Sequence, residues 1–252
     1  MPDSELTDRV ALVTGASRGI GAATARRLSA MGASVVVTAR TRDAIQALVD
    51  ELSPDGSTAL AVAADVSVPA ELDRLVESAR DRFGRLDILV NNAGVLPPAT
   101  RAEKISREDW DTVLAINLSA PWYLSCRAHE LMKDGGVIVN ISSTAAHYPS
   151  VGLSAYNVSK AAMSMMSRSC ALEWARDGVR VVTVVPGKID TEMVRPILDF
   201  IADRDIPPNP LKRVGAVEEV AEAIAYLVSD RAGYITGSTL VIDGGEMLST
   251  AT

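Results

Sequence analysis

The 252-residue chain is 48% hydrophobic and 23% charged, which is the balance of a globular protein and not of a disordered one. A chain of this length is sufficient for one α/β domain, and it buries about three quarters of its unfolded surface without disulfides or metals. Its 32 acidic and 25 basic residues give a net charge of -7. This charge argues against nucleic-acid binding, which requires clustered Lys and Arg.

Cysteine and histidine are too scarce for most metal or thiol chemistry. Cys126 and Cys170 have no partners at metal-ligand spacing, and His129 and His147 alone do not complete a zinc site. No apolar run reaches the roughly 18 uncharged residues of a membrane span, and residues 1–8 are polar and acidic, unlike a signal peptide. We therefore expect a cytoplasmic protein that binds no metal and no membrane.

Short apolar runs that predict strands alternate with longer amphipathic segments that predict helices. The expected strands are Val10–Val13, Ser34–Thr38, Ala59–Ala63, Ile88–Val90, Val137–Ile141, Val179–Val185 and Leu240–Ile242. The expected helices are Ile20–Met31, Thr41–Leu52, Pro69–Phe83, Arg107–Met132, Ala155–Arg176 and Val217–Ser229. Because the strands are almost continuously apolar, helices should cover both faces of their sheet. The order predicts an α/β fold with three layers, a doubly wound seven-stranded parallel sheet and right-handed crossovers.

The chain shows no linker or repeat, so we interpret residues 1–252 as a single domain with one irregular stretch. That stretch, residues 190–215, contains prolines at positions 196, 207, 208 and 210. It is either a surface excursion or a lid over a binding site, because long loops in compact domains are often functional. Together with the motifs described below, we interpret it as a substrate-binding lid.

A glycine-rich turn lies between the first strand and the first helix. Its candidate cofactor-binding residues are Gly15, Ser17, Arg18, Gly19, Ile20 and Gly21. Glycines at such a turn allow backbone N–H groups to approach a pyrophosphate at the positive end of the helix. Three glycines in a turn are a weak signal alone, and their place between strand and helix strengthens it.

The residues after the second strand favour a phosphorylated dinucleotide. An acid at this point selects NAD by accepting from the ribose 2′-hydroxyl, but here the first acid is Asp43. Arg40 and Arg18 are instead placed to hold a 2′-phosphate. Charge-assisted hydrogen bonds contribute about 1.5–3 kcal/mol each, enough to favour NADP(H) by about a hundredfold or more. The alternative is that both arginines are simply solvated.

Tyr156 and Lys160 form a candidate acid/base pair. They are four residues apart, so on a helix their side chains reach the same face. A nearby ammonium, together with oxidised nicotinamide when it is present, lowers the pKa of a tyrosine toward neutrality, and the phenol then exchanges a proton with a carbonyl or hydroxyl oxygen. Ser143 would hydrogen-bond to that same oxygen. The alternative is an ordinary exposed pair on an amphipathic helix.

These motifs together resemble the classical short-chain dehydrogenase/reductase family, near its 3-oxoacyl-[acyl-carrier-protein] reductase and carbonyl reductase branch. The matches run from about Val10 to Gly245 and comprise Thr14-Gly15-x-x-x-Gly19-x-Gly21, Asn91-Asn92-Ala93-Gly94, Asn117, Ser143, Tyr156-x-x-x-Lys160, Pro186-Gly187, Ile189, Thr191 and Asp243-Gly244-Gly245. One departure is Val182, where many members have asparagine. The resemblance implies a Rossmann fold, a nicotinamide cofactor and, in most members, a homotetramer.

The resemblance also implies roles for individual residues. Asn117, Ser143, Tyr156 and Lys160 correspond to a catalytic tetrad, in which Lys160 also binds the nicotinamide ribose and Asn117 anchors a proton-relaying water. Further cofactor contacts are implied at Asp65, Val66, Asn92, Ala93, Gly94, Pro186, Gly187, Ile189 and Thr191. An acid such as Asp65 after a strand is, alternatively, an ordinary helix cap.

The expected substrate wall is mostly apolar and comprises His147, Tyr148, Leu153 and Met193, although His147 is as consistent with a structural histidine. We therefore expect an NADP(H)-dependent oxidoreductase that interconverts a ketone and a secondary alcohol on a small apolar molecule. The first alternative is a 3-oxoacyl-[acyl-carrier-protein] reductase, whose acidic carrier requires a basic patch. The segments where we expect such a patch, residues 131–135 and 175–178, pair each base with an acid, which ranks this alternative below a free small substrate. A second alternative is a non-catalytic NADP-binding sensor or scaffold.

Overall fold

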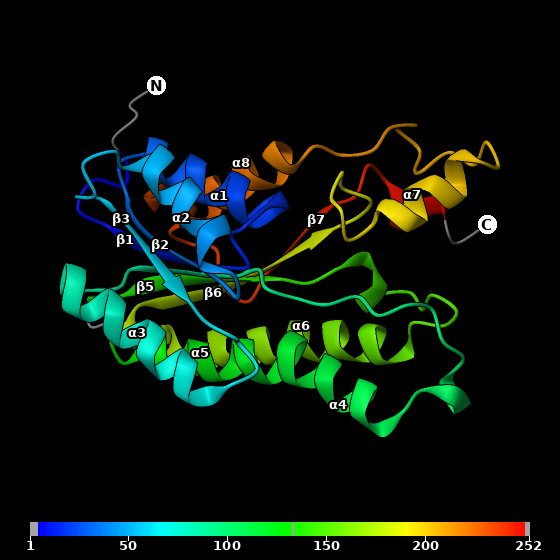
Figure 1. Cartoon of the computed structure of the whole chain (residues 1–252), viewed down its shortest axis with the longest axis horizontal. Helices are drawn as coiled ribbons and strands as arrows, with labels where there is room; N and C mark the ends of the chain where they lie inside the picture. Colours follow the sequence, from blue (N-terminus) through cyan, green and yellow to red (C-terminus); the bar gives the residue numbers. More distant parts are fainter. Residues whose placement is uncertain (1–4, 133, 250–252) are drawn as a thin grey trace.

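Seven parallel strands form the central sheet of the computed structural model, which describes residues 5–132 and 134–249 (Figure 1). The strands are β1 (Val10–Thr14), β2 (Ser34–Ala39), β3 (Ala59–Ala63), β4 (Ile88–Asn91), β5 (Gly136–Ile141), β6 (Val179–Pro186) and β7 (Thr239–Ile242). They lie in the order β3-β2-β1-β4-β5-β6-β7. The predicted doubly wound parallel sheet is confirmed, with each strand within one or two residues of its expected bounds.

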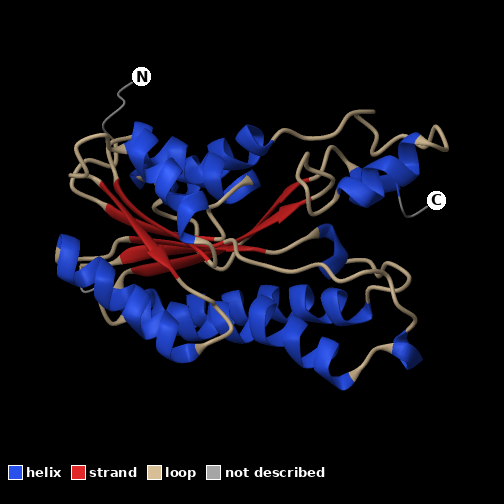
Figure 2. Cartoon of the chain, viewed as in Figure 1, coloured by secondary structure: helices blue, strands red, loops and turns tan. Residues whose placement is uncertain are grey.

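Helices cover both faces of the sheet (Figure 2). One face carries α1 (Gly19–Ala30), α2 (Arg42–Leu52) and α8 (Val217–Val228), and the other carries α3 (Pro69–Phe83), α4 (Arg107–Leu114), α5 (Ala120–His129) and α6 (Ser154–Trp174). Two further helices, α7 (Arg195–Ala202) and α9 (Glu246–Ser249), lie beside the carboxyl end of β7. No helix within the described ranges is long and apolar enough to cross a bilayer.

The hydrophobic core has two layers, one on each side of the sheet. Val13 and Val37 point into the layer beneath α1, α2 and α8, whereas Leu12 and Val36 point into the layer beneath α3, α5 and α6. All four side chains are 0% exposed. Because both faces of each strand are buried, the strands need apolar residues at every position, which explains their continuous apolar sequence.

A buried polar chain crosses the second core layer and links strands to helices. Asn91 and Asn140 are in register on β4 and β5, and the Asn91 Nδ2 donates to Asn140 Oδ1 at 2.8 Å. Asn91 also donates to Ser125 on α5 at 3.0 Å, and Asn140 donates to Ser167 on α6 at 2.8 Å. Since buried amides are costly when unpaired, this chain favours a single register and helix position.

Two expected elements differ from the structure. The predicted helix Arg107–Met132 is interrupted by a π-helical segment, Ala115–Ser119, and ends at His129. Residues 190–215 contain the helix α7, which sequence analysis did not predict because three prolines follow it and Pro196 begins it. A proline in the first helical turn is compatible with a helix, since its missing N–H has no partner there anyway.

The glycine-rich turn brings helix α1 against the loops that follow β1 and β4. Gly15 has φ +65, a conformation that favours glycine. Gly21 has an ordinary φ, but a Cβ there would lie 2.5 Å from the Gly15 carbonyl oxygen and 2.5 Å from the Asn92 Nδ2. Gly21 is therefore required by the close approach of the helix to two loops and not by a turn.

We expect Gly21→Ala to destabilise the protein by about 1–3 kcal/mol, because the added methyl group overpacks this contact. Urea unfolding measures the change, and Gly233→Ala is the control, since its Cβ would meet only the Asp230 carbonyl oxygen at 3.1 Å. Equal stability of the two variants would contradict the packing role of Gly21.

Candidate active site

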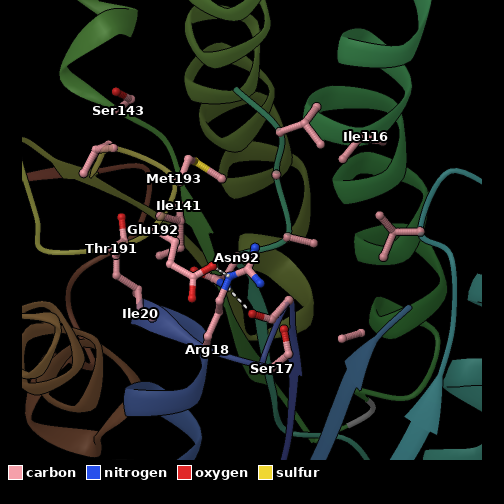
Figure 3. Close-up of a pocket in the computed structure, with 18 of the residues that line it drawn as sticks. Ser17, Arg18, Ile20, Asn92, Ile116, Ile141, Ser143, Thr191, Glu192 and Met193 are labelled. Atoms are coloured by element: carbon pink, nitrogen blue, oxygen red, sulfur yellow. Dashed lines mark hydrogen bonds and ion pairs between the residues drawn. The ribbon is translucent and has the colours of Figure 1, made fainter. Parts of the chain in front are cut away.

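A cavity of about 480 Å³ opens at the carboxyl ends of the strands, where the strand order reverses between β1 and β4 (Figure 3). Ligands of doubly wound folds bind at this switch point. The structure brings most of the predicted residues together here, and those that line the cavity are Gly15, Ser17, Arg18, Gly19, Ile20, Arg40, Asp65, Val66, Asn92, Ala93, Gly94, Ser143, Tyr156, Lys160, Pro186, Gly187, Ile189, Thr191 and Met193.

Hydrogen bonds clamp the glycine turn to the loop that follows β4. The Thr14 Oγ1 accepts from the backbone N–H groups of Asn92 and Ala93 at 3.0 and 2.9 Å. In return, the Asn92 Nδ2 donates to the carbonyls of Thr14 and Gly15 at 2.9 and 3.1 Å. A Cβ on Gly15 would lie 2.8 Å from the Ala93 Cα, so the two loops lie in backbone contact at the edge of the cavity.

Lys160 is a buried cation beneath the cavity. Its residue is 4% exposed, and its Nζ donates to the Ile141 carbonyl at the end of β5 at 2.8 Å. Loss of hydration disfavours the ammonium form, which lowers the pKa of Lys160 to about 8. The side chain therefore exchanges its proton near neutral pH.

Tyr156 lies at the cavity wall and hydrogen-bonds with the Ser143 side chain. Burial raises the pKa of Tyr156, and the hydrogen bond with Ser143 opposes that rise. The net shift of the Tyr156 pKa is upward, whereas a close ammonium would lower it. The Lys160 ammonium is turned to Ile141 and lies 5.8 Å from the centre of the phenol ring. In the chain alone, Tyr156 is therefore a protonated phenol at neutral pH.

Asn117 does not line the cavity but lies directly behind it, in the π-helical segment between α4 and α5. It is 0% exposed, and its side-chain amide pairs with the backbone of Val95 at 2.8 and 2.9 Å. Its Nδ2 also lies 3.2 Å from Ser159 Oγ. A Cβ on Gly94 would touch both Asn117 Oδ1, at 3.3 Å, and Lys160 Nζ, at 3.5 Å. Asn117 and Lys160 thus both lie against Gly94, and Lys160 Nζ lies 5.8 Å from the centre of the Tyr156 ring.

Comparisons with known proteins agree with this geometry. A family model described as enoyl-(acyl carrier protein) reductase matches residues 15–246. A 3-oxoacyl-[acyl-carrier-protein] reductase of Synechocystis sp. is 41% identical, covering 96% of this chain and 98% of the relative. The chain belongs to the classical short-chain dehydrogenase/reductase family.

Other members of the family are also similar over their full length. A cyclohexanol dehydrogenase of Acinetobacter sp. is 37% identical and covers 96% of each chain. The crystal structure of a short-chain type dehydrogenase/reductase from Mycobacterium marinum matches with a TM-score of 0.90 and 34% identity, covering 97% of each chain. As a short-chain dehydrogenase/reductase, the protein is an oxidoreductase that acts on CH–OH groups or the corresponding ketones.

Both arginines of the predicted phosphate site line the cavity, and each has an acid nearby. Arg18 reaches across to Glu192, with 3.2 Å between Nε and Oε2 (Figure 3). Hydrogen bonds from Ser67, together with the charge of Arg40, lower the pKa of Asp65. Asp65 Oδ1 accepts from the Ser67 backbone N–H at 2.9 Å in the loop before α3, but it does not cap that helix, whose N-cap residue is Val68.

Of the four expected substrate residues, Met193 lines the cavity and is 43% exposed. His147 is exposed, and His147, Tyr148 and Leu153 are not among the residues that line the cavity. The Tyr148 hydroxyl is hydrogen-bonded to Thr144 and Glu246 instead. Within the described ranges, no three His, Cys, Asp or Glu side chains gather as a metal site.

Sequence analysis missed several residues that line the cavity of this short-chain dehydrogenase/reductase. Most are apolar neighbours of predicted residues at strand ends, and the full set is Ala39, Thr41, Ala44, Ala64, Val95, Ile116, Ile141, Ser142, Glu192 and Val194. Their position next to a motif is the only signal that was available. Nothing in the sequence pointed to a role for Glu192, because that role depends on where Arg18 lies in the structure.

We expect Lys160→Met to change how stability depends on pH. Below about pH 8 the ammonium is present in both folded and unfolded states, and the folded state bears its full desolvation cost. Between the folded pKa of about 8 and the ordinary value of 10.5, only the unfolded chain keeps the proton. The free energy of unfolding of the wild type should therefore rise with pH through this window, by about 3 kcal/mol relative to the variant.

Urea unfolding of both proteins between pH 7 and the upper end of that window measures this difference. Parallel stability curves for the two proteins would show that the Lys160 pKa is not shifted by burial.

Proposed function

We propose that the protein is an NADP(H)-dependent oxidoreductase that interconverts a ketone and a secondary alcohol on a small apolar molecule, with Tyr156 as the acid/base. The observation that carries this proposal is the placement of Tyr156 and Ser143 at one cavity wall, with buried Lys160 one helical turn from Tyr156. The proposal includes a single NAD(P)-binding domain over residues 1–252 and a substrate lid over residues 190–215.

The chain supplies a proton and an orienting hydrogen bond at one oxygen. The protonated Tyr156 phenol donates to a carbonyl oxygen in reduction, and Ser143 holds that oxygen in place. Lys160, with a pKa of about 8, then supplies a proton to Tyr156, and Asn117 lies behind the cavity, where it and Lys160 both flank Gly94. The nicotinamide, when bound, supplies or accepts the hydride.

The residues around the adenosine end support a 2′-phosphate. After β2 the cavity is lined by Arg40, Thr41 and Ala44, none of which is an acid that would accept from a ribose 2′-hydroxyl. Arg18 faces the same cavity from the glycine turn. Two guanidiniums at this position favour NADP(H) over NAD(H) through charge-assisted hydrogen bonds.

A second candidate function is reduction of a 3-oxoacyl group on an acyl carrier protein. Relatives with that name are 41% identical in Synechocystis sp. and 39% identical in Escherichia coli. The surface near α5 and α6 does not favour it, because Arg127 pairs with Asp73 and Glu130, while His129 pairs with Asp177. Lys133, in the expected carrier segment, lies outside the described residues. We therefore place a free substrate first, as the cyclohexanol dehydrogenase relative also suggests.

Two further parts of the proposal concern assembly and catalysis. A homotetramer is supported by apolar side chains on the outer face of α5 and α6, where Trp122, Met165 and Leu172 are 51%, 57% and 83% exposed.

A non-catalytic NADP-binding sensor is disfavoured, because such a protein has no need for Asn117, Ser143, Tyr156 and Lys160 at one site.

We expect Tyr156→Phe to reduce the rate of hydride transfer from NADPH to ketones by about 10²–10⁴-fold, because the general acid is lost. Affinity for NADPH should be retained. The measurement is NADPH absorbance with a panel of ketones, with Tyr226→Phe on α8 as the control. Unchanged activity in Tyr156→Phe would refute the mechanism, and turnover of an acetoacetyl thioester far above every free ketone would reverse the order of the two candidates.

We expect Arg40→Asp to weaken NADPH binding by about a hundredfold while sparing NADH. The substitution replaces a guanidinium that donates hydrogen bonds to the 2′-phosphate with a carboxylate that repels it. Titration of each cofactor by fluorescence or calorimetry measures this. Equal losses for NADPH and NADH would exclude the phosphate role of Arg40.

A further inference from the structure

A buried ionic cluster beside the cavity joins three segments that are far apart in the sequence. Lys188 follows the Pro186-Gly187 turn, Glu246 begins α9, and Tyr148 follows the turn that Ser143 begins. The Lys188 Nζ contacts the Glu246 carboxylate, and the Tyr148 hydroxyl lies close to the same carboxylate. The Lys188 and Glu246 side chains are only 21% and 10% exposed.

We propose that Glu246 is a positioning residue, which acts through Tyr148 on the Ser143 turn and through Lys188 on the lid. This inference rests on the proposed function, because Ser143 is the residue that orients the substrate oxygen there. Glu246 itself is not among the residues that line the cavity.

The Ser143 turn is anchored at one end by β5 and at the other by Tyr148. Ser143 begins the 3-10 turn Thr144–Ala146, and its Oγ accepts from the Ala145 N–H at 3.2 Å. The Tyr148 N–H donates to the Thr144 carbonyl at 3.3 Å, and the Tyr148 hydroxyl lies close to Glu246 and Thr144. Beyond Tyr148, Pro149 and Val151 are exposed, and the Ser150 carbonyl accepts from Asn157 Nδ2 at 3.2 Å. The Tyr148 hydroxyl is therefore the point at which the far end of this turn meets Glu246.

The same carboxylate reaches the lid. Lys188 also donates to the Pro208 carbonyl at 3.1 Å, and the Leu211 N–H donates to the Gly244 carbonyl at 3.3 Å. A Cβ on Gly187 would lie 2.8 Å from Glu246 Oε2, so the carboxylate also rests on a residue of the cavity wall. Glu246 thus sets the relative positions of the Ser143 turn, the Gly187 turn and the lid.

A stabilising role alone does not explain a buried ion pair. Removing two charges from water costs about as much as their attraction returns, and a pair of apolar residues of similar volume is often equally stable. Directional contacts of the carboxylate with an ammonium and a phenol instead specify geometry. Loss of such supporting contacts weakens activity while leaving the reacting groups in place.

Two variants test the proposal. Tyr148→Phe removes only the hydroxyl, and Lys188→Met/Glu246→Met removes the carboxylate without leaving a buried unpaired charge. The matched control is Tyr123→Phe, which removes another hydroxyl that donates to a carboxylate, Asp73, at 2.9 Å. The readouts are kcat and KM for a ketone, the Kd of NADPH, and hydrogen exchange of residues 144–148 and 206–213.

We expect both test variants to lower kcat by about tenfold with an unchanged Kd for NADPH. Exchange should become faster at residues 144–148 in both, and at residues 206–213 in the double variant, while Tyr123→Phe behaves as the wild type. Wild-type kcat and exchange in Tyr148→Phe would overturn the proposal. A rise in ketone KM in Tyr148→Phe alone would also overturn it, since Tyr148 would then be a substrate contact.

Hydrogen exchange separates this proposal from the proposed function. If the wild type reduces no ketone, the proposed function fails, but faster exchange at residues 144–148 in both variants still supports the anchoring role of Glu246. Unchanged exchange would reject that role whatever the activity.

Discussion

The burial of one ammonium group organises the active site. Lys160 lies under the cavity, where its ammonium donates one hydrogen bond to the carbonyl of Ile141, and a buried ammonium without that bond would be still less favourable. Helix α6 must therefore lie with this residue against the end of β5, and the Ser142 hydroxyl, 3.0 Å from the Lys160 carbonyl, ties the strand to the helix. One turn earlier on the same helix, Tyr156 is carried to the cavity wall.

The neighbouring loops are arranged around the same cation. The loop after β4 passes so close that a side chain on Gly94 would touch both Lys160 and Asn117, and the π-helical segment places Asn117 behind it. A π-helical turn inserts one extra residue into the helix and often marks a functional site. The proton chemistry of the site thus depends on backbone geometry in three separate loops.

Charge in this protein is locally balanced, despite the net charge of -7. Arg18 pairs with Glu192, and the charge of Arg40 acts on Asp65, so both guanidiniums of the cavity have an acid nearby. A 2′-phosphate, as proposed, would exchange one partner of Arg18 for another. An overall acidic chain is compatible with such a site, because screened charges beyond about 10 Å contribute little to the local potential.

Periodicity was sufficient to predict the seven strands and their helices on both faces, and the family resemblance implied many of the residues that line the cavity. The same patterns did not reveal the π-helical segment at Ala115–Ser119, since its residues continue an amphipathic helix. They did not reveal α7 either, because a proline at its start resembles a loop. In the chain alone, burial raises the Tyr156 pKa because the neighbouring lysine is turned away; the fall expected with oxidised nicotinamide bound stays a prediction.

The sequence by itself determined which chemical groups are available: a tyrosine and a lysine four residues apart, a serine, two arginines, and no histidine-rich or cysteine-rich site. Only the tertiary structure decided their environment. Desolvation of Lys160, the pairing of Arg18 with Glu192, and the cluster of Tyr148, Lys188 and Glu246 each join segments that are distant in the chain. Short-range patterns carry no information about such contacts, because burial and hydrogen-bond partners are set by the packing of remote elements.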